Sequence, residues 1–539
     1  MTSALETTFD VLSTSRNESA VPALINALDC NDGHVYEGAI QALVARRNKA
    51  GHLAVLARWH ILSASQRELV LEGRGRMSGA LRDAVLADDS QLFENACELV
   101  VKFTEFDLVP TLVTLAENKI SEHAKAATEL VAKLTSQLSE IVYGPRDPHD
   151  RRDPNSIRRY VLESLERSVE RFRCHGRSEL IEAFVILAGP SCGLLKKILD
   201  DPHHPCYNTV VGTLANSRSA GVAQLLMDFL QRESTSLSVL NLISRRADPP
   251  FVARLLASTD DKSFPKVAKN LGRIRSFSWL QFDSPTIDSF EEQDQARCIK
   301  LITASGMNPD AILDILERAL IHGNPAGRYA ACEALAEFPG DRPSQLILRA
   351  VRDLDPEVQA SATRHLRDRH LPGTMSTLLK LIDSPHEIVR EASREALSEF
   401  SFQNYLSRFE TLSDDARRST GIVVRKVDTE TIPSLLAEME NKSRKARMRA
   451  IEIAETMQLV PQLCEGLIGL LSDEDHLVRA AAADALQLCK TQEVLEALQH
   501  ATTDSSAAVQ NAAKSSLATF NSIPNGFATG IATSVEAQL

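Results

Sequence analysis

The stretch from Gly373 to Phe400 shows a pattern of apolar and polar positions that recurs along this chain. Its first part carries one apolar stripe at helical spacing, formed by Met375, Leu378, Leu379 and Ile382. The segment Asp383-Ser384-Pro385 then interrupts the stripe, because proline suits the start of a new helix. A second stripe follows at Val389, Ala392, Ala396, Leu397 and Phe400. The pattern therefore predicts two helices joined by a short turn.

The same unit returns at a fixed interval. Three leucines follow one another 31 residues apart: Leu335, Leu366 and Leu397. Two positions near the C-terminus recur after the same interval: Val478 as Val509, and Leu486 as Leu517. A sustained period of this length indicates a repeat array. A unit this short buries its apolar face only by stacking on its neighbours.

Further copies of the unit extend over much of the remaining chain. The unit recurs clearly at residues 21–43 and 463–486, and the more degenerate copies lie at 88–103, 109–138, 222–230, 251–271, 293–320 and 444–457. Helical spacing dominates in these copies, so we expect high helix content and almost no strand. The predicted fold class is all-α: an α-solenoid, or superhelix, of stacked antiparallel helix pairs in repeats of about 31 residues.

Two regions break the rhythm and suggest domain boundaries. Residues 143–156 are rich in proline and charge, which predicts an irregular insertion. Residues 276–292 contain Trp279, Phe282, Pro285 and Phe290, and predict a loop or irregular junction. The predicted organisation is N-terminal repeats at 1–141, an insertion loop at 142–156, degenerate central repeats at 157–308, regular C-terminal repeats at 309–521 and a flexible tail at 522–539.

The regular copies resemble HEAT-like repeats, particularly the short variety also found in phycobilisome-lyase-type proteins. The resemblance lies in an Asp-turn-Val-Arg/Gln signature that leads into alanines: Asp473 with Val478-Arg479, Asp504 with Val509-Gln510, and Asp353 with Val358-Gln359. Asp383 departs from it, standing six rather than five residues before its valine. The resemblance implies an α-solenoid that holds partner proteins, although the fold also hosts a few enzymes.

Charge and cysteine usage narrow the class of protein. The net charge is −12, which disfavours general binding to a phosphate backbone. The N-terminal residues lack the pattern of a secretory signal, and no apolar run reaches the length needed to span a bilayer. Nine cysteines are scattered without a C-x-x-C pair. We therefore expect reduced, mostly buried thiols and a cytoplasmic location, without a membrane partner.

Four short motifs suggest chemistry, and each has a simpler explanation. Gly189–Gly193 matches G-x-S-x-G but follows a helical pattern rather than a strand, so it predicts a turn between helices. His386-Glu387 is the only His-Glu pair, whereas the iron-binding HEAT-like hydroxylases repeat that pair in several units. Asp201–Cys206 lacks a second cluster at zinc-like spacing. Gly73–Gly79 fits no phosphate-binding loop. We predict no catalytic, cofactor or metal residues.

Arginines concentrate in the insertion and in the helix predicted to follow it. The candidate binding residues are Arg146, Arg151, Arg152, Arg158 and Arg159, and further arginines continue to Arg177. Guanidinium groups suit the recognition of carboxylates or phosphates. The alternative is that neighbouring Asp and Glu residues pair with them, so that the loop only caps a junction.

The repeat architecture favours a non-enzymatic scaffold or adaptor that binds one or more proteins along a concave face lined by the second helices. Exposed positions on these helices are expected to form the contacts: Glu391, Arg394, Arg479 and Asp484. One alternative is a HEAT-fold enzyme of the lyase or hydroxylase type. The other is a nucleic-acid binder that uses the Arg-rich segment 146–177, which the overall charge disfavours. No small-molecule substrate or cofactor is evident.

Overall fold

The computed structural model describes residues 4–145, 152–280 and 287–521. These residues form α-helices and short 3-10 helices, and no strand occurs among them. The all-α solenoid fold predicted from the sequence is confirmed. The chain divides into two compact units, Met1–Ile315 and Leu316–Leu539, and each is described by itself.

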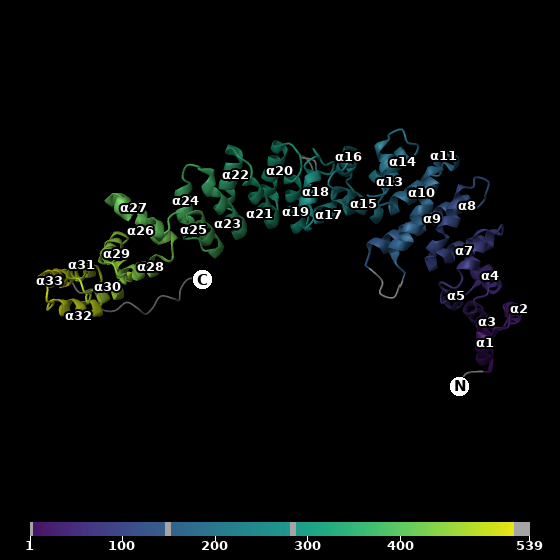
Figure 1. The fold of residues 1–539 in the computed structure, drawn as a ribbon, viewed down its shortest axis with the longest axis horizontal. Helices are drawn as coiled ribbons and strands as arrows, with labels where there is room; N and C mark the ends of the chain where they lie inside the picture. The colour runs from purple at the N-terminus through teal and green to yellow at the C-terminus, as the bar shows by residue number, and fades with distance from the viewer. Residues whose placement is uncertain (1–3, 146–151, 281–286, 522–539) are drawn as a thin grey trace, which may run out of the picture. The chain divides into compact units, whose positions relative to one another are not determined.

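Unit 1 contains the helices drawn from purple to teal in Figure 1. Their bounds are α1 (Ala4–Thr14), α2 (Ala20–Ala27), α3 (Gly33–Ala45), α4 (Lys49–Ala57), η1 (Trp59–Ile61), α5 (Ala64–Leu71), α6 (Ser78–Val85), α7 (Ser90–Phe103), η2 (Phe106–Leu108), α8 (Val109–Glu117), α9 (Ala124–Tyr143), α10 (Pro154–Glu170), α11 (Phe172–His175), α12 (Ser178–Leu187), α13 (Gly193–Asp200), α14 (Tyr207–Asn216), α15 (Ala220–Leu230), α16 (Leu237–Arg245), α17 (Pro249–Ala257), η3 (Ser258–Asp260), α18 (Phe264–Leu271) and α19 (Glu292–Thr303).

Unit 2 begins within α20 and continues to the C-terminal helix. The bounds are α20 (Pro309–His322), α21 (Pro325–Leu335), α22 (Asp341–Ala350), α23 (Pro356–Leu366), η4 (Arg367–Arg369), α24 (Thr374–Leu381), α25 (Glu387–Ala396), α26 (Phe402–Arg408), η5 (Phe409–Thr411), α27 (Asp414–Val427), α28 (Thr431–Met439), α29 (Arg444–Thr456), η6 (Val460–Gln462), α30 (Cys464–Leu470), α31 (His476–Ala485), η7 (Leu486–Leu488), α32 (Gln492–Ala501) and α33 (Ala507–Asn521).

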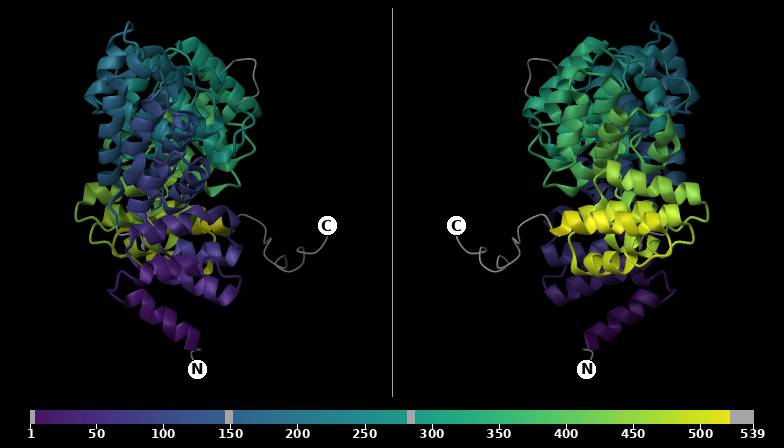
Figure 2. Two further views of the ribbon diagram at one scale, coloured as in Figure 1. Left: turned by 90° about the vertical axis from the view of Figure 1, so that its right-hand side faces the viewer. Right: turned by 90° about the vertical axis from the view of Figure 1, so that its left-hand side faces the viewer.

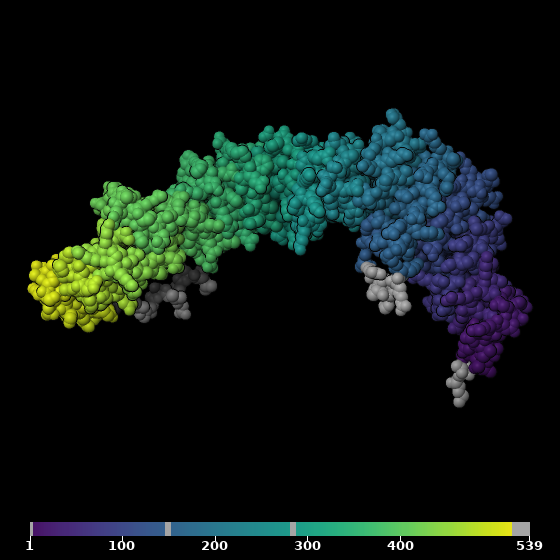
Figure 3. Space-filling model, viewed as in Figure 1, coloured from purple at the N-terminus to yellow at the C-terminus, as the bar shows by residue number. Residues whose placement is uncertain are grey.

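Helices pair within each repeat and stack between repeats. In unit 2 the first helix of each pair has an even number and the second helix an odd number. The second helix α23 packs on its own first helix, α22, and on the neighbouring second helices α21 and α25. The right-hand view of Figure 2 shows the last pair, α32 and α33, side by side in yellow. In Figure 3 the surface of unit 2 is coloured in chain order, from green to yellow.

The periodic positions form the core of unit 2. Leu335, Leu366 and Leu397 are fully buried at the ends of successive second helices. Val478 and Val509 are fully buried as well. Alanines lie where second helices approach one another, because a larger side chain would push the helices apart. The 31-residue period therefore reflects the side chains that each repeat buries against its neighbours.

Side-chain caps begin the second helices where the sequence places a turn. The carboxylate of Asp355 accepts hydrogen bonds from the backbone N–H groups of Glu357 and Val358, at 2.9 and 3.2 Å. Pro356 occupies the first helical position, where a missing N–H costs nothing. Asn324 and Pro325 do the same for α21. These caps satisfy backbone donors that a helix start otherwise leaves unpaired.

Guanidinium groups join consecutive repeats. Arg328 pairs with Asp353, Arg447 with Asp473 and Arg479 with Asp504, in each case across 25 or 26 residues. In each pair the arginine lies in the first turns of a second helix and the aspartate in the inter-helix turn of the following repeat. Bidentate pairing fixes the relative position of the two groups.

The irregular region predicted at 276–292 is confirmed where the structure describes it, because α18 ends at Leu271 and α19 begins at Glu292. Trp279 is buried there between Phe277 and Phe290. Phe282 and Pro285 lie outside the described residues.

The expectation of reduced thiols is wrong for one pair, because Cys464 and Cys489 form a disulfide. Their Cα atoms lie 6.4 Å apart, in the range that a disulfide requires. Sequence spacing alone did not reveal this proximity. Three of the seven free cysteines are buried, Cys206, Cys298 and Cys332, while Cys30 and Cys174 are exposed.

Within the described ranges, none of the helices combines the length and apolar character that a membrane crossing requires.

Candidate functional site

The second helices α29 and α31 lie side by side and form the walls of an open groove. Small buried residues let the two helices approach closely: Ala446, Ala450 and Ala454 on α29, and Ala482, Ala483 and Ala485 on α31. Asp475 caps the start of α31, and its carboxylate accepts a hydrogen bond from the backbone N–H of Leu477 at 2.8 Å. The outward faces of both helices remain available to line the groove.

The α29–α31 groove has a volume of about 490 Å³. Apolar side chains contribute part of its lining: Phe409, Met448, Ile451 and Ala481. The other lining residues are polar or charged: Glu410, Lys445, Arg449, Glu452, Glu455 and Asp484. A hollow of this size that mixes apolar and charged groups has the properties of a site for a partner's side chains.

Ion pairs neutralise two of the carboxylates that line the groove, and the other two have no ion-pair partner among the described residues. Lys445 Nζ lies 2.8 Å from Glu410 Oε1, and Arg417 Nη1 lies 2.8 Å from Glu452 Oε1. Within the described part of the chain, Glu455 and Asp484 form no ion pair or side-chain hydrogen bond. The groove therefore presents two uncompensated negative charges.

The surroundings of these two carboxylates disfavour their charged forms. Burial raises the pKa of Glu455, and the negative charges of Asp484 and Glu452 raise it further. Burial also raises the pKa of Asp484. Both side chains still reach solvent, so the loss of hydration is partial. A cation placed between them would relieve this unfavourable environment.

Unit 1 contains a comparable groove between the second helices α7 and α9. It has a volume of about 400 Å³ and is lined by residues that include Phe93, Cys97, Val101 and Leu130. Three glutamates and two lysines also line it: Glu94, Glu98, Glu129, Lys102 and Lys133. Here Glu98 accepts a hydrogen bond from the indole N–H of Trp59 at 2.8 Å. The charges are more nearly balanced than in the α29–α31 groove.

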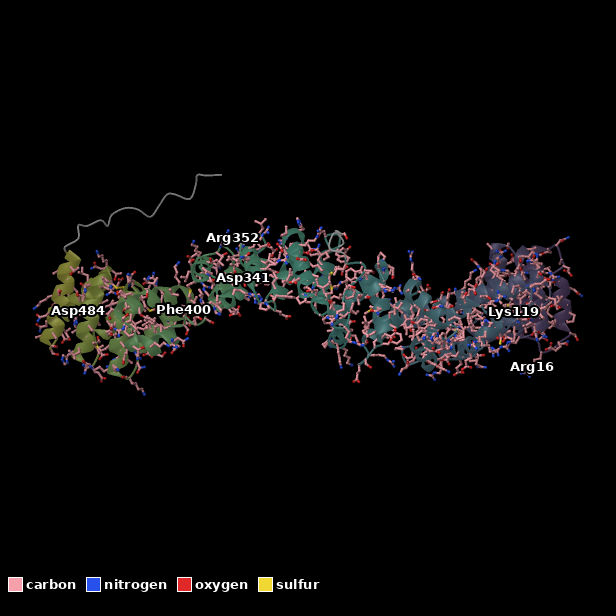
Figure 4. The ribbon with its side chains drawn as sticks, turned by 90° about the horizontal axis from the view of Figure 1, so that it is seen from above. Arg16, Lys119, Asp341, Arg352, Phe400 and Asp484 are labelled. Carbon is pink, nitrogen blue, oxygen red and sulfur yellow. A yellow bond between two sulfur atoms is a disulfide. The ribbon has the colours of Figure 1, made fainter. Side chains whose placement is uncertain are left out.

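The four second-helix residues predicted as contacts have different environments. Asp484 lines the α29–α31 groove, and Figure 4 labels it on unit 2. Arg479 instead binds Asp504, so it joins repeats. Glu391 is exposed on α25, and Arg394 is half-buried. The repeat pattern predicted which face is exposed, whereas the partners of each charge depend on the neighbouring repeat.

Two of the three described arginines that were predicted to bind a partner contact the protein's own backbone. The guanidinium of Arg152 donates to the carbonyl of Thr104 at 3.1 Å and lies over the ring of Phe106. Arg158 Nε donates to the carbonyl of Leu187 at 2.7 Å. Arg159 is exposed and forms no ion pair with a described residue. Arg146 and Arg151 lie outside the described residues, so binding by this cluster stays a prediction.

The other motifs occupy turns and helix starts. Gly193 begins α13 after the helix α12, so G-x-S-x-G at 189–193 is an inter-helix turn, as predicted. His386 is the cap position before α25. Gly73 and Gly75 lie between α5 and α6, and Gly79 lies in the first turn of α6. Among the described residues no group of three or more His, Cys, Asp or Glu side chains has the proximity needed to hold a metal ion.

Sequence reasoning missed Glu455 as a groove residue. Its signal was present, since Glu455 stands on the outward face of the Arg444–Thr456 helix, seven residues after Met448. The partner helix α31 lies about one repeat further along the chain, so Glu455 and Asp484 come together only when the repeats stack.

The comparison with protein families agrees with the repeat assignment. Residues 432–518 match the family model of HEAT repeats, which confirms the resemblance for this segment. No curated protein matches the sequence. Among solved structures, Kap121p is 12% identical, with a TM-score of 0.28 over 96% of this chain and 69% of that chain. A homology model of the full-length AP-3 complex in an intermediate open conformation is 11% identical, with a TM-score of 0.29 over 96% and 98% of the two chains.

Proposed function

We propose that this chain, whose residues 432–518 are HEAT repeats, is a non-enzymatic scaffold that binds other proteins in the grooves between its second helices. The observation that carries the proposal is the α29–α31 groove, where two uncompensated carboxylates border an apolar lining. Such a site suits a lysine or arginine side chain that is flanked by apolar residues on a partner segment.

Charge and geometry support this choice of ligand. A cation between Glu455 and Asp484 would lie next to two carboxylates whose pKa values are raised by burial and, for Glu455, by like charge. Met448 and Ala481 offer apolar surface to the aliphatic stem of the same side chain. The lysine and the arginine that already line the groove, Lys445 and Arg449, each lie beside a glutamate, Glu410 and Glu438.

The proposal is tested by capturing partners from a lysate of the native host with the full chain. A carbodiimide, which joins a carboxylate directly to a lysine amine, should link Glu455 or Asp484 to a lysine of the captured partner. The linked residues are identified by mass spectrometry. We expect the variant Glu455→Lys/Asp484→Lys to lose both the partner and the cross-link.

The matched control is Glu430→Lys/Glu440→Lys, which changes two exposed glutamates outside the groove by the same total charge. It should retain the partner. Equal capture by the wild-type chain and the groove variant, with no cross-link at either carboxylate, would contradict the proposal.

A further inference from the structure

A second, larger groove lies at the first-helix side of unit 2, between the end of α20 and the helix α22. Its volume is about 630 Å³. Its lining includes the residues Ile321, Arg328, Arg349, Arg352, Asp353 and Leu354. Figure 4 labels Arg352 and shows it well separated from Asp484, so this groove is distinct from the α29–α31 groove.

Three arginines and one aspartate give the α20–α22 groove a net positive charge. Arg328 and Asp353 neutralise each other through their bidentate pair. Arg349 and Arg352 are exposed and form no ion pair or side-chain hydrogen bond with a described residue. Two guanidinium groups therefore remain available, in a chain whose net charge is −12.

Large apolar side chains stand in solvent beside these arginines. Leu354 is 97% exposed in the turn between α22 and α23, and Ile321 is 39% exposed near the end of α20. Leu348 is half-buried between them in the lining. An exposed apolar group next to free guanidinium groups is typical of a surface that a partner covers.

We propose that the α20–α22 groove binds a segment of a partner protein in which a leucine-like side chain is flanked by carboxylates. Guanidinium forks bind carboxylates through two parallel hydrogen bonds, so Arg349 and Arg352 recognise the acidic residues. Leu354 and Ile321 cover the apolar side chain. This inference rests on the proposed scaffold function and adds a surface of opposite charge preference to it.

The composition of the groove favours a peptide over a nucleic acid. Phosphate-backbone binding requires an extended basic surface, whereas only two free arginines occur here and Asp353 lies among them. Leu354 and Ile321 also have no role in contacts to a phosphate backbone. A nucleic acid is therefore the competing outcome that the experiment must be able to reveal.

The test selects a dodecapeptide phage library on the immobilised full-length chain, with Arg349→Glu/Arg352→Glu as the counter-selected variant. Enriched peptides are synthesised with a fluorescent label, and their affinities are measured by anisotropy. We expect sequences in which Asp or Glu adjoins Leu, Ile, Met or Phe, and affinities at least about tenfold weaker for the variant. The control Arg408→Glu/Arg418→Glu changes two exposed arginines outside the groove and should bind as the wild type does.

Three outcomes would overturn the inference: enrichment of no acidic-apolar sequence, equal affinity for the wild type and the Arg349→Glu/Arg352→Glu variant, or binding of a labelled single-stranded oligonucleotide that requires the same two arginines. Glu455→Lys/Asp484→Lys is assayed in parallel. If only basic peptides are enriched and they depend on Glu455 and Asp484, the scaffold function stands while the inference about the α20–α22 groove fails.

Discussion

The guanidinium of Arg328 donates two parallel hydrogen bonds to the carboxylate of Asp353, Nε to Oδ2 and Nη2 to Oδ1, both at 2.9 Å. A third donor, Nη1, reaches the carbonyl of Gly323 at 2.9 Å in the turn before α21. One arginine side chain thus contacts both the turn before its own helix and the inter-helix turn of the next repeat. Arg479 makes the same set of contacts with Asp504 and with the carbonyl of Asp473.

Removing the Arg328 side chain should destabilise unit 2. Arg328→Ala leaves the largely buried Asp353 carboxylate without its guanidinium partner, and hydrogen bonds to charged groups contribute about 1.5–3 kcal/mol. We expect a loss of about 2 kcal/mol in the free energy of unfolding, and faster amide hydrogen exchange in α21 and α23. Arg349→Ala, on an exposed side chain without an ion pair, should change the free energy of unfolding by less than about 0.5 kcal/mol.

Binding in the α29–α31 groove should weaken on acidification. The pKa values of Glu455 and Asp484 are raised, so both carboxylates take up protons at a higher pH than ordinary side chains, which titrate near pH 4. As the pH is lowered, a cationic partner should therefore be released at a higher pH than from ordinary carboxylates. The affinity of the partner peptide that the cross-link identifies, added as a free peptide over a series of pH values, should show this shift. A midpoint at or below the ordinary value would contradict the assignment.

The first repeats of unit 1 should lose stability as the pH falls. His52 is buried, its Nε2 atom has no hydrogen-bond partner in the described structure, and burial lowers the pKa of its imidazole. The folded state holds the neutral form. The contribution of His52 to the free energy of unfolding is complete above the pKa of the unfolded chain, about 6.5. It decreases as the pH falls below that value, because only the unfolded chain readily takes up the proton.

Hydrogen exchange of α3 and α4 at a series of pH values measures this effect. The variant His52→Gln, which does not titrate, should show a smaller pH dependence than the wild type. An unchanged pH dependence in the variant would show that other groups are responsible.

The disulfide between Cys464 and Cys489 should stabilise the C-terminal repeats. It closes a loop with a sequence separation of 25, for which loop-closure entropy predicts about 3.5 kcal/mol. Non-reducing peptide mapping should find these two cysteines linked, and reduction or Cys464→Ser should lower the free energy of unfolding by that order. Two free thiols at these positions under oxidising conditions would refute the prediction.

The 31-residue period of the sequence made the helix pairs predictable. The contacts between repeats depend instead on which residue occupies each repeat position. The signature position after valine is Arg479 in one repeat and Gln510 in the next. Gln510 keeps the contact to its own turn, because its Nε2 donates to the carbonyl of Asp504 at 2.7 Å. Its amide is uncharged, so it cannot form an ion pair with an aspartate as Arg479 does. The sequence shows the position, while its partners follow only from the stack.

The grooves were less predictable than the helices. Their walls come from residues about 30 positions apart, such as Glu455 and Asp484, and the local spacing within one helix does not show which charges are already paired. Arg479 illustrates the difficulty, because its pattern predicted an exposed contact and its carboxylate partner lies in the next repeat. Leu354 was also missed, since a single leucine in a turn gives no periodic signal.

The joint after α25 is held differently from the joints at Arg328, Arg447 and Arg479, because an exposed lysine of α27 reaches back across it: Lys426 Nζ lies 2.7 Å from Asp383 Oδ2 in the turn before α25. Arg390 donates to the carbonyls of Ser384 and Pro385 in its own turn, and the described structure gives it no aspartate in the following repeat. The buried cluster around Val389 is also separate from the one that begins at Phe402. An exposed ion pair contributes little, and the described residues share no buried cluster across this joint, so a pulling force applied along unit 2 should extend the stack first between α25 and α27.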